Sequence, residues 1–414
     1  MSLAKLSLVA VMATGIMTTA SLAAPLEELI KDVDVTGFTR LRYTHDEEGG
    51  KVNNKSEGKW NFKGELNIKT KIDDNFFAVV GIRYNESDTS TTTSTSTGGR
   101  TGGNDFDLYR AYFGYNVGGT TITVGRQEVG AFFTDDMYGD GIAVVNTDIE
   151  GLVLAAVWFD VFEDDGDIGG LDLNGDGIRG GVVDRVNGKL VTDHNLYGVA
   201  ALGNYDPVSF QLWYSILEDV GALFVTELAT SFDITDEWSV GLMGQYAFAD
   251  LKNSFKEGTG NAADDSDFYA IKASTSAFGF DFSAGYLNFS TDTDNLSVTS
   301  FEDQGKFISP GEELLDYSLY RGENWAWFVA AAYTIPDTGW TFGVDYVSGE
   351  RTYDLGAGNE DFDMQEVVAR VTYKHNKNLT FKTWYSWVED DGYNRVANRG
   401  YENERVRFEA KYSF

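Results

Sequence analysis

The sequence predicts an all-β protein, a transmembrane antiparallel β-barrel of about eighteen strands. Two observations lead to this fold class. From Asp34 onward, segments of about ten residues alternate apolar and polar side chains, which is the period of a strand with one apolar and one wet face. The breaks between these segments alternate between short turns and long polar loops. Outer-membrane barrels have this asymmetry, with short periplasmic turns and long extracellular loops.

The composition agrees with this fold and narrows the function. The 414 residues are 42% hydrophobic and include 46 Gly, 4 Pro and no Cys, which excludes a disordered chain, disulfides and thiolate sites. Acidic residues number 65 against 32 Lys and Arg, a net charge of −33. This charge argues against nucleic acid as a partner and favours small soluble cations. Length alone also allows two or three globular domains, so the periodicity decides.

Residues 1–23 are predicted to be a secretory signal peptide that is cleaved after Ala23. Lys5 precedes an apolar run over residues 6–16, and small residues surround the cleavage point. An anchoring helix is the alternative, but the run is too short and is interrupted by Thr and Gly. Residues 24–414 then form a single barrel domain in the outer membrane of a Gram-negative cell, and they contain no run of about 20 apolar residues for a spanning helix.

The strands are clearest at 59–71, 379–387 and 405–414. In the first, the apolar face is Trp60, Phe62, Gly64, Leu66 and Ile68, and the wet face is Asn61, Lys63, Glu65, Asn67 and Lys69. Short turns are expected at 73–75, 116–119, 148–151, 205–207, 234–237, 277–279, 335–339 and 375–378. Longer segments are expected at 87–104, 127–140, 163–193, 250–265, 291–324, 351–361 and 390–401.

The number of strands follows from two further assignments. With a short strand at 141–147 and a short outer loop at 218–221, the count reaches about eighteen, and an even number places both termini on the periplasmic side. A soluble β-sandwich or propeller is the alternative. It is disfavoured because it does not need aromatic residues at the strand ends, whereas a barrel uses them as interfacial girdles.

Several segments resemble the Campylobacter-type major outer membrane porin family. They are residues 25–35 (PLEELIKDVDV), 143–152 (AVVNTDIEGL), 301–305 (FEDQG), 310–313 (PGEE) and 411–414 (KYSF), in the same order along the whole chain. The resemblance implies a homotrimer of eighteen-stranded barrels that form a general diffusion channel, with calcium in the lumen as an option. This sequence departs most from the family in its outer loops.

A barrel of this size is too wide for side chains to fill, so it holds water unless a loop narrows it. Segment 127–140, the third outer loop, is expected to fold inward, with Phe132 and Phe133 against the wall. It carries Asp135, Asp136 and Asp140 beside these aromatic residues. Alternation points one arc of basic residues inward, because the first and last strands become neighbours on closure. These residues are Arg40, Arg42, Lys63, Arg83, Arg110, Arg126, Arg370, Lys382, Arg405 and Arg407.

We expect the loop carboxylates to face this basic arc across a constriction, giving a transverse field that orients polar solutes. In the alternative, the basic residues only solvate the wall or pair with neighbours such as Glu65, Glu366 and Glu409. The acidic loops above a partly basic wall predict weak cation selectivity.

Calcium has two candidate sites, although no cofactor is required for diffusion. Asp172, Asn174 and Asp176 have the spacing of the first half of a calcium loop, but the twelfth position is Val183 instead of Glu. A merely solvated acidic loop is the alternative. The family resemblance instead implies a lumenal ion held by Asp135 or Asp136 with Glu312 or Glu313.

An enzyme is disfavoured because none of the three histidines, His45, His194 and His375, has an evident Ser and Asp partner. The leading function is passive diffusion of ions and small hydrophilic solutes. The alternatives are a substrate-selective channel, for which Phe328 and Trp384 provide too few inward aromatic residues, and an adhesin or structural surface barrel. The other expected partners are outer-membrane lipid and lipopolysaccharide, with which the acidic loops would share divalent ions.

Overall fold

The computed structural model describes residues 33–49, 55–91, 99–163, 185–186, 189–258, 263–292, 295–301, 304–315, 319–354, 358–391 and 401–414. The predicted signal peptide lies outside this part of the chain, as do Asp172, Asn174 and Asp176 of the first candidate calcium site. Within the described ranges, no helix has the length and apolar character that a membrane span requires.

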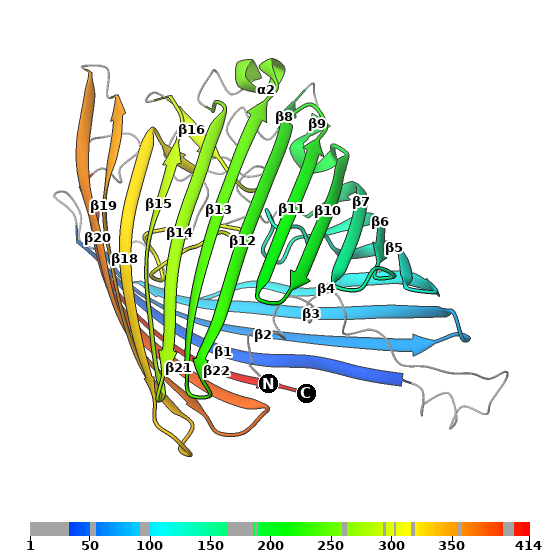
Figure 1. Cartoon of the computed structure of the whole chain (residues 1–414), viewed down its shortest axis with the longest axis horizontal. Helices are drawn as coiled ribbons and strands as arrows, with labels where there is room; N and C mark the ends of the chain where they lie inside the picture. The colour runs from blue at the N-terminus through cyan, green and yellow to red at the C-terminus, as the bar shows by residue number, and fades with distance from the viewer. Residues whose placement is uncertain are drawn as a thin grey trace.

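Eighteen strands form one antiparallel sheet that closes into a barrel (Figure 1). They are β1 (Val33–Gly49), β2 (Lys55–Lys71), β3 (Phe76–Thr91), β4 (Gly99–Val117), β5 (Thr120–Glu128), β6 (Tyr138–Asn146), β7 (Leu152–Phe162), β10 (Leu196–Tyr205), β11 (Val208–Leu217), β12 (Gly221–Thr235), β13 (Trp238–Leu251), β14 (Ser266–Ala277), β15 (Phe280–Ser290), β18 (Glu323–Thr334), β19 (Trp340–Asp354), β20 (Asn359–Lys374), β21 (Leu379–Asp390) and β22 (Tyr401–Ser413). The first and last strands pair with each other, Arg42 opposite Glu409, which confirms the predicted closure.

The smaller elements belong to the long connections. They are β8 (Arg185–Val186), β9 (Lys189–Leu190), the 3-10 helix η3 (Val191–Asp193), α2 (Asn253–Gly258), β16 (Leu296–Val298) and β17 (Leu319–Arg321). In Figure 1, β8, β9 and α2 lie at one end of the barrel, opposite the short turns. The predicted separation of short and long connections is therefore confirmed.

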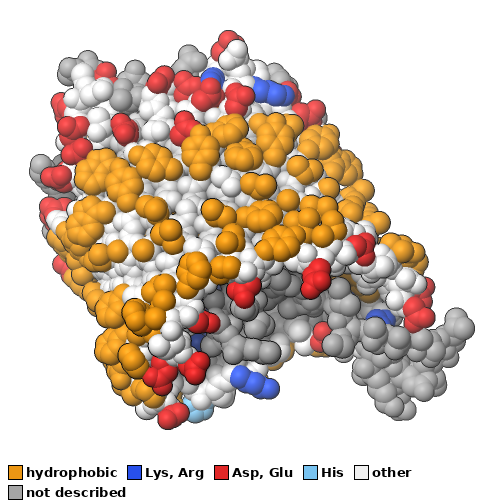
Figure 2. All heavy atoms as spheres, viewed as in Figure 1, with side chains coloured by type: hydrophobic (Ala, Val, Ile, Leu, Met, Phe, Trp, Pro, Cys, Tyr) orange, Lys and Arg blue, Asp and Glu red, His pale blue; other side chains and the backbone are white. Residues whose placement is uncertain are grey.

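Alternation divides each strand into an outer and an inner face. On β2, Trp60 is 47% exposed, whereas the Lys63 side chain is only 13% exposed. The outward apolar side chains make a continuous band with acidic residues above and below it (Figure 2). This band is the surface that a barrel presents to the hydrocarbon of a membrane.

Aromatic pairs border the short turns at one edge of the band. Phe280 stacks on Tyr333 with 4.3 Å between ring centroids, and Trp340 stacks on Tyr373 at 4.5 Å. The turn between β14 and β15 has positive φ at both central residues, 53° at Phe278 and 83° at Gly279, which suits the right-handed twist of a hairpin. These pairs form the interfacial girdle that the sequence predicts.

Two outer loops fold into the barrel: loop 3 (residues 129–137, between β5 and β6) and loop 7, between β15 and β18, in its described residues 295–301 and 304–315. The backbone N–H groups of Phe301 and Lys306 donate to the carbonyl oxygens of Phe133 and Phe132, each at 2.8 Å. The alternation pattern predicted an inward fold for loop 3, whereas only the family resemblance placed Glu312 and Glu313 of loop 7 in the lumen. Loop 7 folds inward because its apolar residues are buried. These are Phe301, Phe307, Ile308, Leu314 and Leu315.

The inner wall has two unlike parts. The apolar wall consists of the buried inward residues of β10–β15 and β18, namely Leu196, Ala200, Leu202, Trp213, Leu217, Leu223, Val225, Ala247, Ala249, Leu251, Phe268, Ala270, Leu287, Phe289, Ala326 and Phe328. The charged wall consists of ionised residues on β1–β4 and β20–β22, namely Arg40, Arg42, Lys63, Glu65, Arg83, Asp107, Arg110, Arg370, Lys382, Arg405, Arg407 and Glu409. Loops 3 and 7 pack on the apolar wall as one hydrophobic core.

Candidate functional site: the constriction

Loop 3 is packed at its aromatic residues and exposed at its acidic tip. Phe133 lies edge-on to Trp213 of the apolar wall at 6.2 Å and to Phe301 of loop 7 at 5.3 Å. Asp135 and Asp136, in contrast, have side chains that are 58% and 49% exposed. The loop therefore presents two partly solvated carboxylates inside the barrel.

Two lysines from different parts of the chain contact the acidic tip. Lys306 of loop 7 reaches Asp135, Nζ to Oδ1 3.1 Å, and Lys63 of β2 reaches Asp136, Nζ to Oδ2 3.3 Å. Lys63 also contacts Glu65 at 3.3 Å, so it is shared between the wall and the loop. Lys306 was not among the predicted site residues. The feature that could have indicated it is the apolar pair at residues 307–308, which follows it directly in an otherwise polar loop.

Arg40 and Arg42 share one wall carboxylate. Arg42 donates through Nε and Nη2 to Glu409 at 3.0 and 2.8 Å, while Arg40 Nε lies 3.9 Å from the same oxygen. Arg40 also donates to Asn61 at 3.3 Å. Pairing within the wall, the alternative from the sequence, therefore holds for these two arginines.

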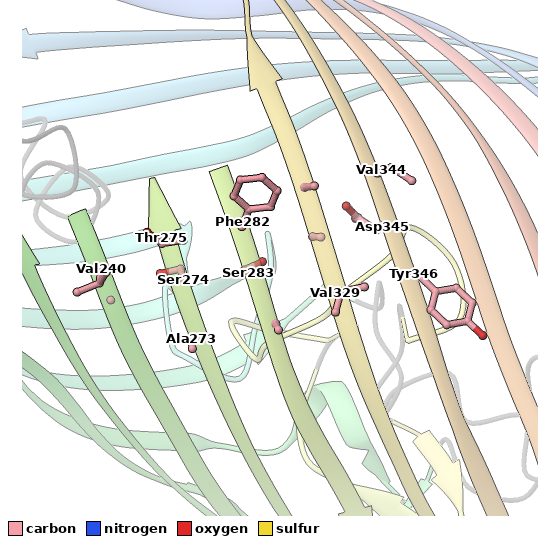
Figure 3. A pocket seen from close by; sticks show the side chains of 14 residues that line it. Val240, Ala273, Ser274, Thr275, Phe282, Ser283, Val329, Val344, Asp345 and Tyr346 are labelled. Carbon is pink, nitrogen blue, oxygen red and sulfur yellow. The ribbon is translucent and has the colours of Figure 1, made fainter. Parts of the chain in front are cut away.

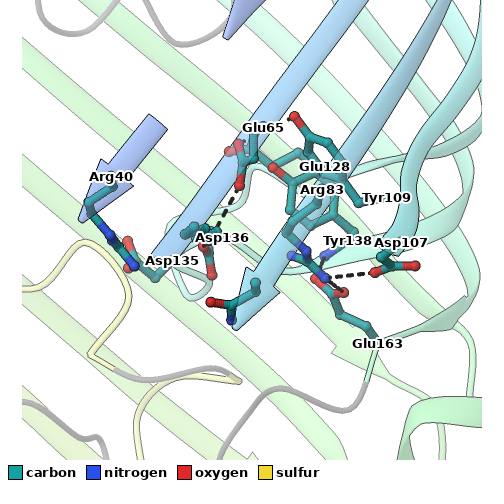
Figure 4. Close-up of polar contacts among 12 residues, drawn as sticks. Arg40, Glu65, Arg83, Asp107, Tyr109, Glu128, Asp135, Asp136, Tyr138 and Glu163 are labelled. Carbon is teal, nitrogen blue, oxygen red and sulfur yellow. Dashed lines mark hydrogen bonds and ion pairs between the residues drawn. The ribbon is translucent and has the colours of Figure 1, made fainter. Parts of the chain in front are cut away.

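Arg83 and Arg110 surround a pair of perpendicular tyrosine rings, Tyr109 and Tyr138, with centroids 4.9 Å apart (Figure 4). Both guanidinium carbons lie 5.3–5.6 Å from these rings, within cation–π range. The carboxylate partners of Arg83 are Asp107 and Glu163, each at 2.9 Å, and that of Arg110 is Glu128 at 2.7 Å. This cluster is rigid because every arginine has both an ionic and an aromatic neighbour.

Arg126 and Asp140 pair with each other, Nη2 to Oδ2 2.8 Å. The prediction placed Asp140 on the inward loop, and this is wrong. The ladder between β5 and β6 continues through Arg126–Asp140 to Glu128–Tyr138, so β6 begins at Tyr138 instead of at residue 141.

Loop 7 contacts the opposite end of the charged wall. Glu312 lies 2.8 Å from Lys382 and 3.6 Å from Arg370, and Glu313 lies 3.1 Å from Arg405. Arg370 and Arg405 also pair with Asp345 and Asp46 of the wall. Arg407 stacks over Trp384 at 4.8 Å and donates to Thr44 at 3.2 Å. Burial raises the pKa of Glu313 above the ordinary glutamate value, although Arg405 opposes this shift.

The acidic residues of loops 3 and 7 do not fit a bridging calcium ion in this arrangement. Asp135 and Asp136 contact lysines at one side, whereas Glu312 and Glu313 contact the cations of β20–β22. Among the described residues, no three or more metal-ligating side chains gather into one group.

The sequence model of the Campylobacter major outer membrane protein family matches residues 1–414. The chain belongs to this family. The name of the family places the chain in the outer membrane of a Gram-negative cell. Together with the barrel, the family identifies a porin channel rather than an enzyme. Among curated proteins, no match is found.

Solved structures share the architecture of this porin. OpdQ of Pseudomonas aeruginosa is 14% identical with a TM-score of 0.67, covering 92% of this chain and 99% of its own. OccK7 (OpdD) of Pseudomonas aeruginosa is 15% identical with a TM-score of 0.69 over the same shares. OccAB3 of Acinetobacter baumannii is 13% identical with a TM-score of 0.67, covering 92% of this chain and 100% of its own. At these identities the likeness shows the fold alone.

A cavity of about 590 Å³ lies on the outer surface of the porin, over β13–β15, β18 and β19 (Figure 3). Its lining includes Phe282, Val329 and Val344, which are exposed and belong to the outward apolar band. The cavity therefore faces the membrane, and the constriction inside the barrel is the candidate site of permeation.

Proposed function

We propose that the porin passes ions and small hydrophilic solutes by passive diffusion with a weak preference for cations. The observation that carries this proposal is a difference in exposure. Asp135 and Asp136 at the tip of loop 3 stay about half exposed although each contacts a lysine, whereas Arg40 and Arg42 of the charged wall are less exposed and share Glu409. Solvated carboxylates attract cations into the narrow part of the lumen, whereas paired arginines attract anions less strongly.

The same geometry supports a transverse field. Carboxylates on one side of the lumen and guanidinium groups on the other act on a dipolar solute in a region of reduced dielectric constant, where charges interact more strongly than in bulk water. A polar solute gains by aligning with this field. An apolar solute gains nothing and interrupts the water column.

Charge reversal tests the preference directly. The double variant Asp135→Lys and Asp136→Lys should move the reversal potential in a salt gradient toward anions in planar-bilayer recordings. The matched control is Asp236→Lys with Asp337→Lys, which makes the same charge change in two exposed periplasmic turns. An unchanged reversal potential in the loop 3 variant would show that the loop does not control selectivity.

A substrate-selective channel remains the second candidate, and the same recordings distinguish it by solute-specific block. Phe328 and Trp384 face inward as expected, but both are buried, and Arg407 covers the Trp384 ring. They therefore offer no stacking surface to a solute.

The remaining partners are proposals of the same kind. We propose a homotrimer on the strength of the family, with lipid around the outer band and lipopolysaccharide beside the acidic loops. Calcium binding by Asp172, Asn174 and Asp176 stays a prediction, and calorimetric heats on addition of calcium would test it.

A further inference from the structure

Loop 7 is attached to the barrel wall through one buried carboxylate. Glu366 lies on β20, points into the barrel and is 0% exposed. Its Oε1 accepts the backbone N–H groups of Glu312 at 2.8 Å and Glu313 at 3.1 Å, and its Oε2 accepts that of Leu314 at 3.1 Å. The sequence suggested Glu366 only as a partner for basic side chains. In the structure it instead accepts hydrogen bonds from the backbone of loop 7.

The turn at this point is shaped to receive the carboxylate. Gly311 has φ of +85°, and a Cβ atom there would lie 2.1 Å from Glu366 Oε2. Only glycine combines this backbone conformation with so close an approach. Three successive N–H groups converge on one anion, an arrangement in which each bond is charge-assisted.

The attachment connects the two walls. On one side of Gly311, Phe307 packs on Phe268 of the apolar wall at 4.6 Å. On the other side, Glu312 and Glu313 contact Lys382 and Arg405 of the charged wall at 2.8 and 3.1 Å. Loop 7 therefore crosses from the apolar wall to the charged wall, and the Glu366 contact fixes the far end of that crossing.

We propose that Glu366 is a positioning residue for permeation: it holds loop 7 across the lumen and thereby sets the largest solute that the channel passes. It touches no solute itself. It acts through Glu312, Glu313 and Lys306, whose places in the constriction depend on the course of loop 7. This inference rests on the proposed diffusion function only because its test measures the permeation of solutes.

The test compares two variants that remove the same charge from the inner wall. Glu366→Gln replaces an acceptor by an amide N–H₂ group that faces the loop N–H groups. Glu409→Gln is the control, because the partners of Glu409 are wall side chains, Arg42 and Arg40, instead of loop backbone. Both are reconstituted as folded protein, checked by the heat-dependent shift in gel migration, and assayed with neutral sugars of increasing size in liposome swelling.

We expect Glu366→Gln to admit larger sugars and to raise single-channel conductance, since loop 7 would no longer be held across the lumen. Glu409→Gln should change ion selectivity and leave the sugar cut-off as in the wild type. Glu366→Asp, which keeps the charge, should lie between the wild type and Glu366→Gln.

A second readout follows the loop itself. The chain has no cysteine, so Leu315→Cys, at a buried position of loop 7, gives a single thiol. A water-soluble maleimide should label it slowly with Glu366 present and several times faster in the Glu366→Gln background.

An unchanged sugar cut-off together with unchanged labelling in Glu366→Gln overturns the inference. Loss of conductance in the wild type would instead contradict the proposed function, so the two failures are distinguishable.

Discussion

The apolar and charged walls of the lumen are built from the same kind of strand but have different functions. On both, outward side chains are apolar and face the membrane. Inward, β10–β15 and β18 carry leucine, alanine and phenylalanine, whereas β1–β4 and β20–β22 carry arginine, lysine and glutamate. An apolar inner face is unfavourable in contact with water, and loops 3 and 7 bury it by packing on it.

The magnitudes show what each wall contributes. Burying one Phe or Leu side chain stabilises by about 1.5–3 kcal/mol, whereas a partly exposed ion pair contributes about 0–1 kcal/mol. The apolar wall therefore provides most of the free energy that holds the loops in place, and Glu366 of β20 adds the attachment of loop 7. The charged wall determines the electric field that a solute meets. A porin can separate these tasks because its lumen is wider than its side chains can fill.

The largest expected effect comes from the apolar wall. Phe133→Ala should weaken the docking of loop 3 by about 3–5 kcal/mol, because it leaves a cavity beside Trp213 and Phe301. Hydrogen exchange followed by mass spectrometry should show faster exchange in residues 129–137. Phe77→Ala is the control, since Phe77 is buried beside Lys69 and Tyr112 on the other side of the barrel. Equal protection of loop 3 in both variants would contradict the division between the walls.

An intermediate effect is expected from the charged wall. The double variant Arg40→Gln and Arg42→Gln leaves Glu409 without its cations, so cation preference should increase. The shift in reversal potential should be roughly half that of the loop 3 reversal and of opposite sign, because two charge units change instead of four. Lys374→Gln with Lys377→Gln, at a periplasmic turn, is the control. A loosened loop 3 in the arginine variant would mean that the charged wall also supports the loops.

The smallest effect is a dependence on pH where loop 7 meets the charged wall. Burial raises the pKa of Glu313, so on acidification this carboxyl takes up its proton at a higher pH than an ordinary glutamate. Arg405 then loses a counter-charge and the lumen gains one positive unit. Cation preference should therefore fall as the pH drops toward the usual glutamate range. Glu313→Gln should abolish this step in selectivity recordings, and its persistence in that variant would assign the step to another group.

Strand positions could be predicted from local pattern because alternation has a period of two and a shift of one residue would turn charged side chains to the lipid. The same pattern placed Arg40, Lys63 and Arg405 on the inner face. It could not find their partners: Arg42 and Glu409 are 367 residues apart in sequence and meet only because the barrel closes. The third loop was recognisable from Phe132 and Phe133 beside the acids, but the start of β6 depended on a backbone ladder that side chains do not reveal.

Loop 7 marks the limit of local reasoning. Its polar residues resemble those of any outer loop, and its inward course depends on Phe268, Gln245 and Glu366, which lie on three different strands. The sequence by itself determined the barrel, its strand number and which face of each strand is charged, because these follow from a two-residue period and from turn lengths. Only the tertiary structure decided that loops 3 and 7 form a hydrophobic core with one wall of the lumen and that a wall carboxylate holds a loop across the pore. Both depend on contacts between residues that closure of the barrel brings together.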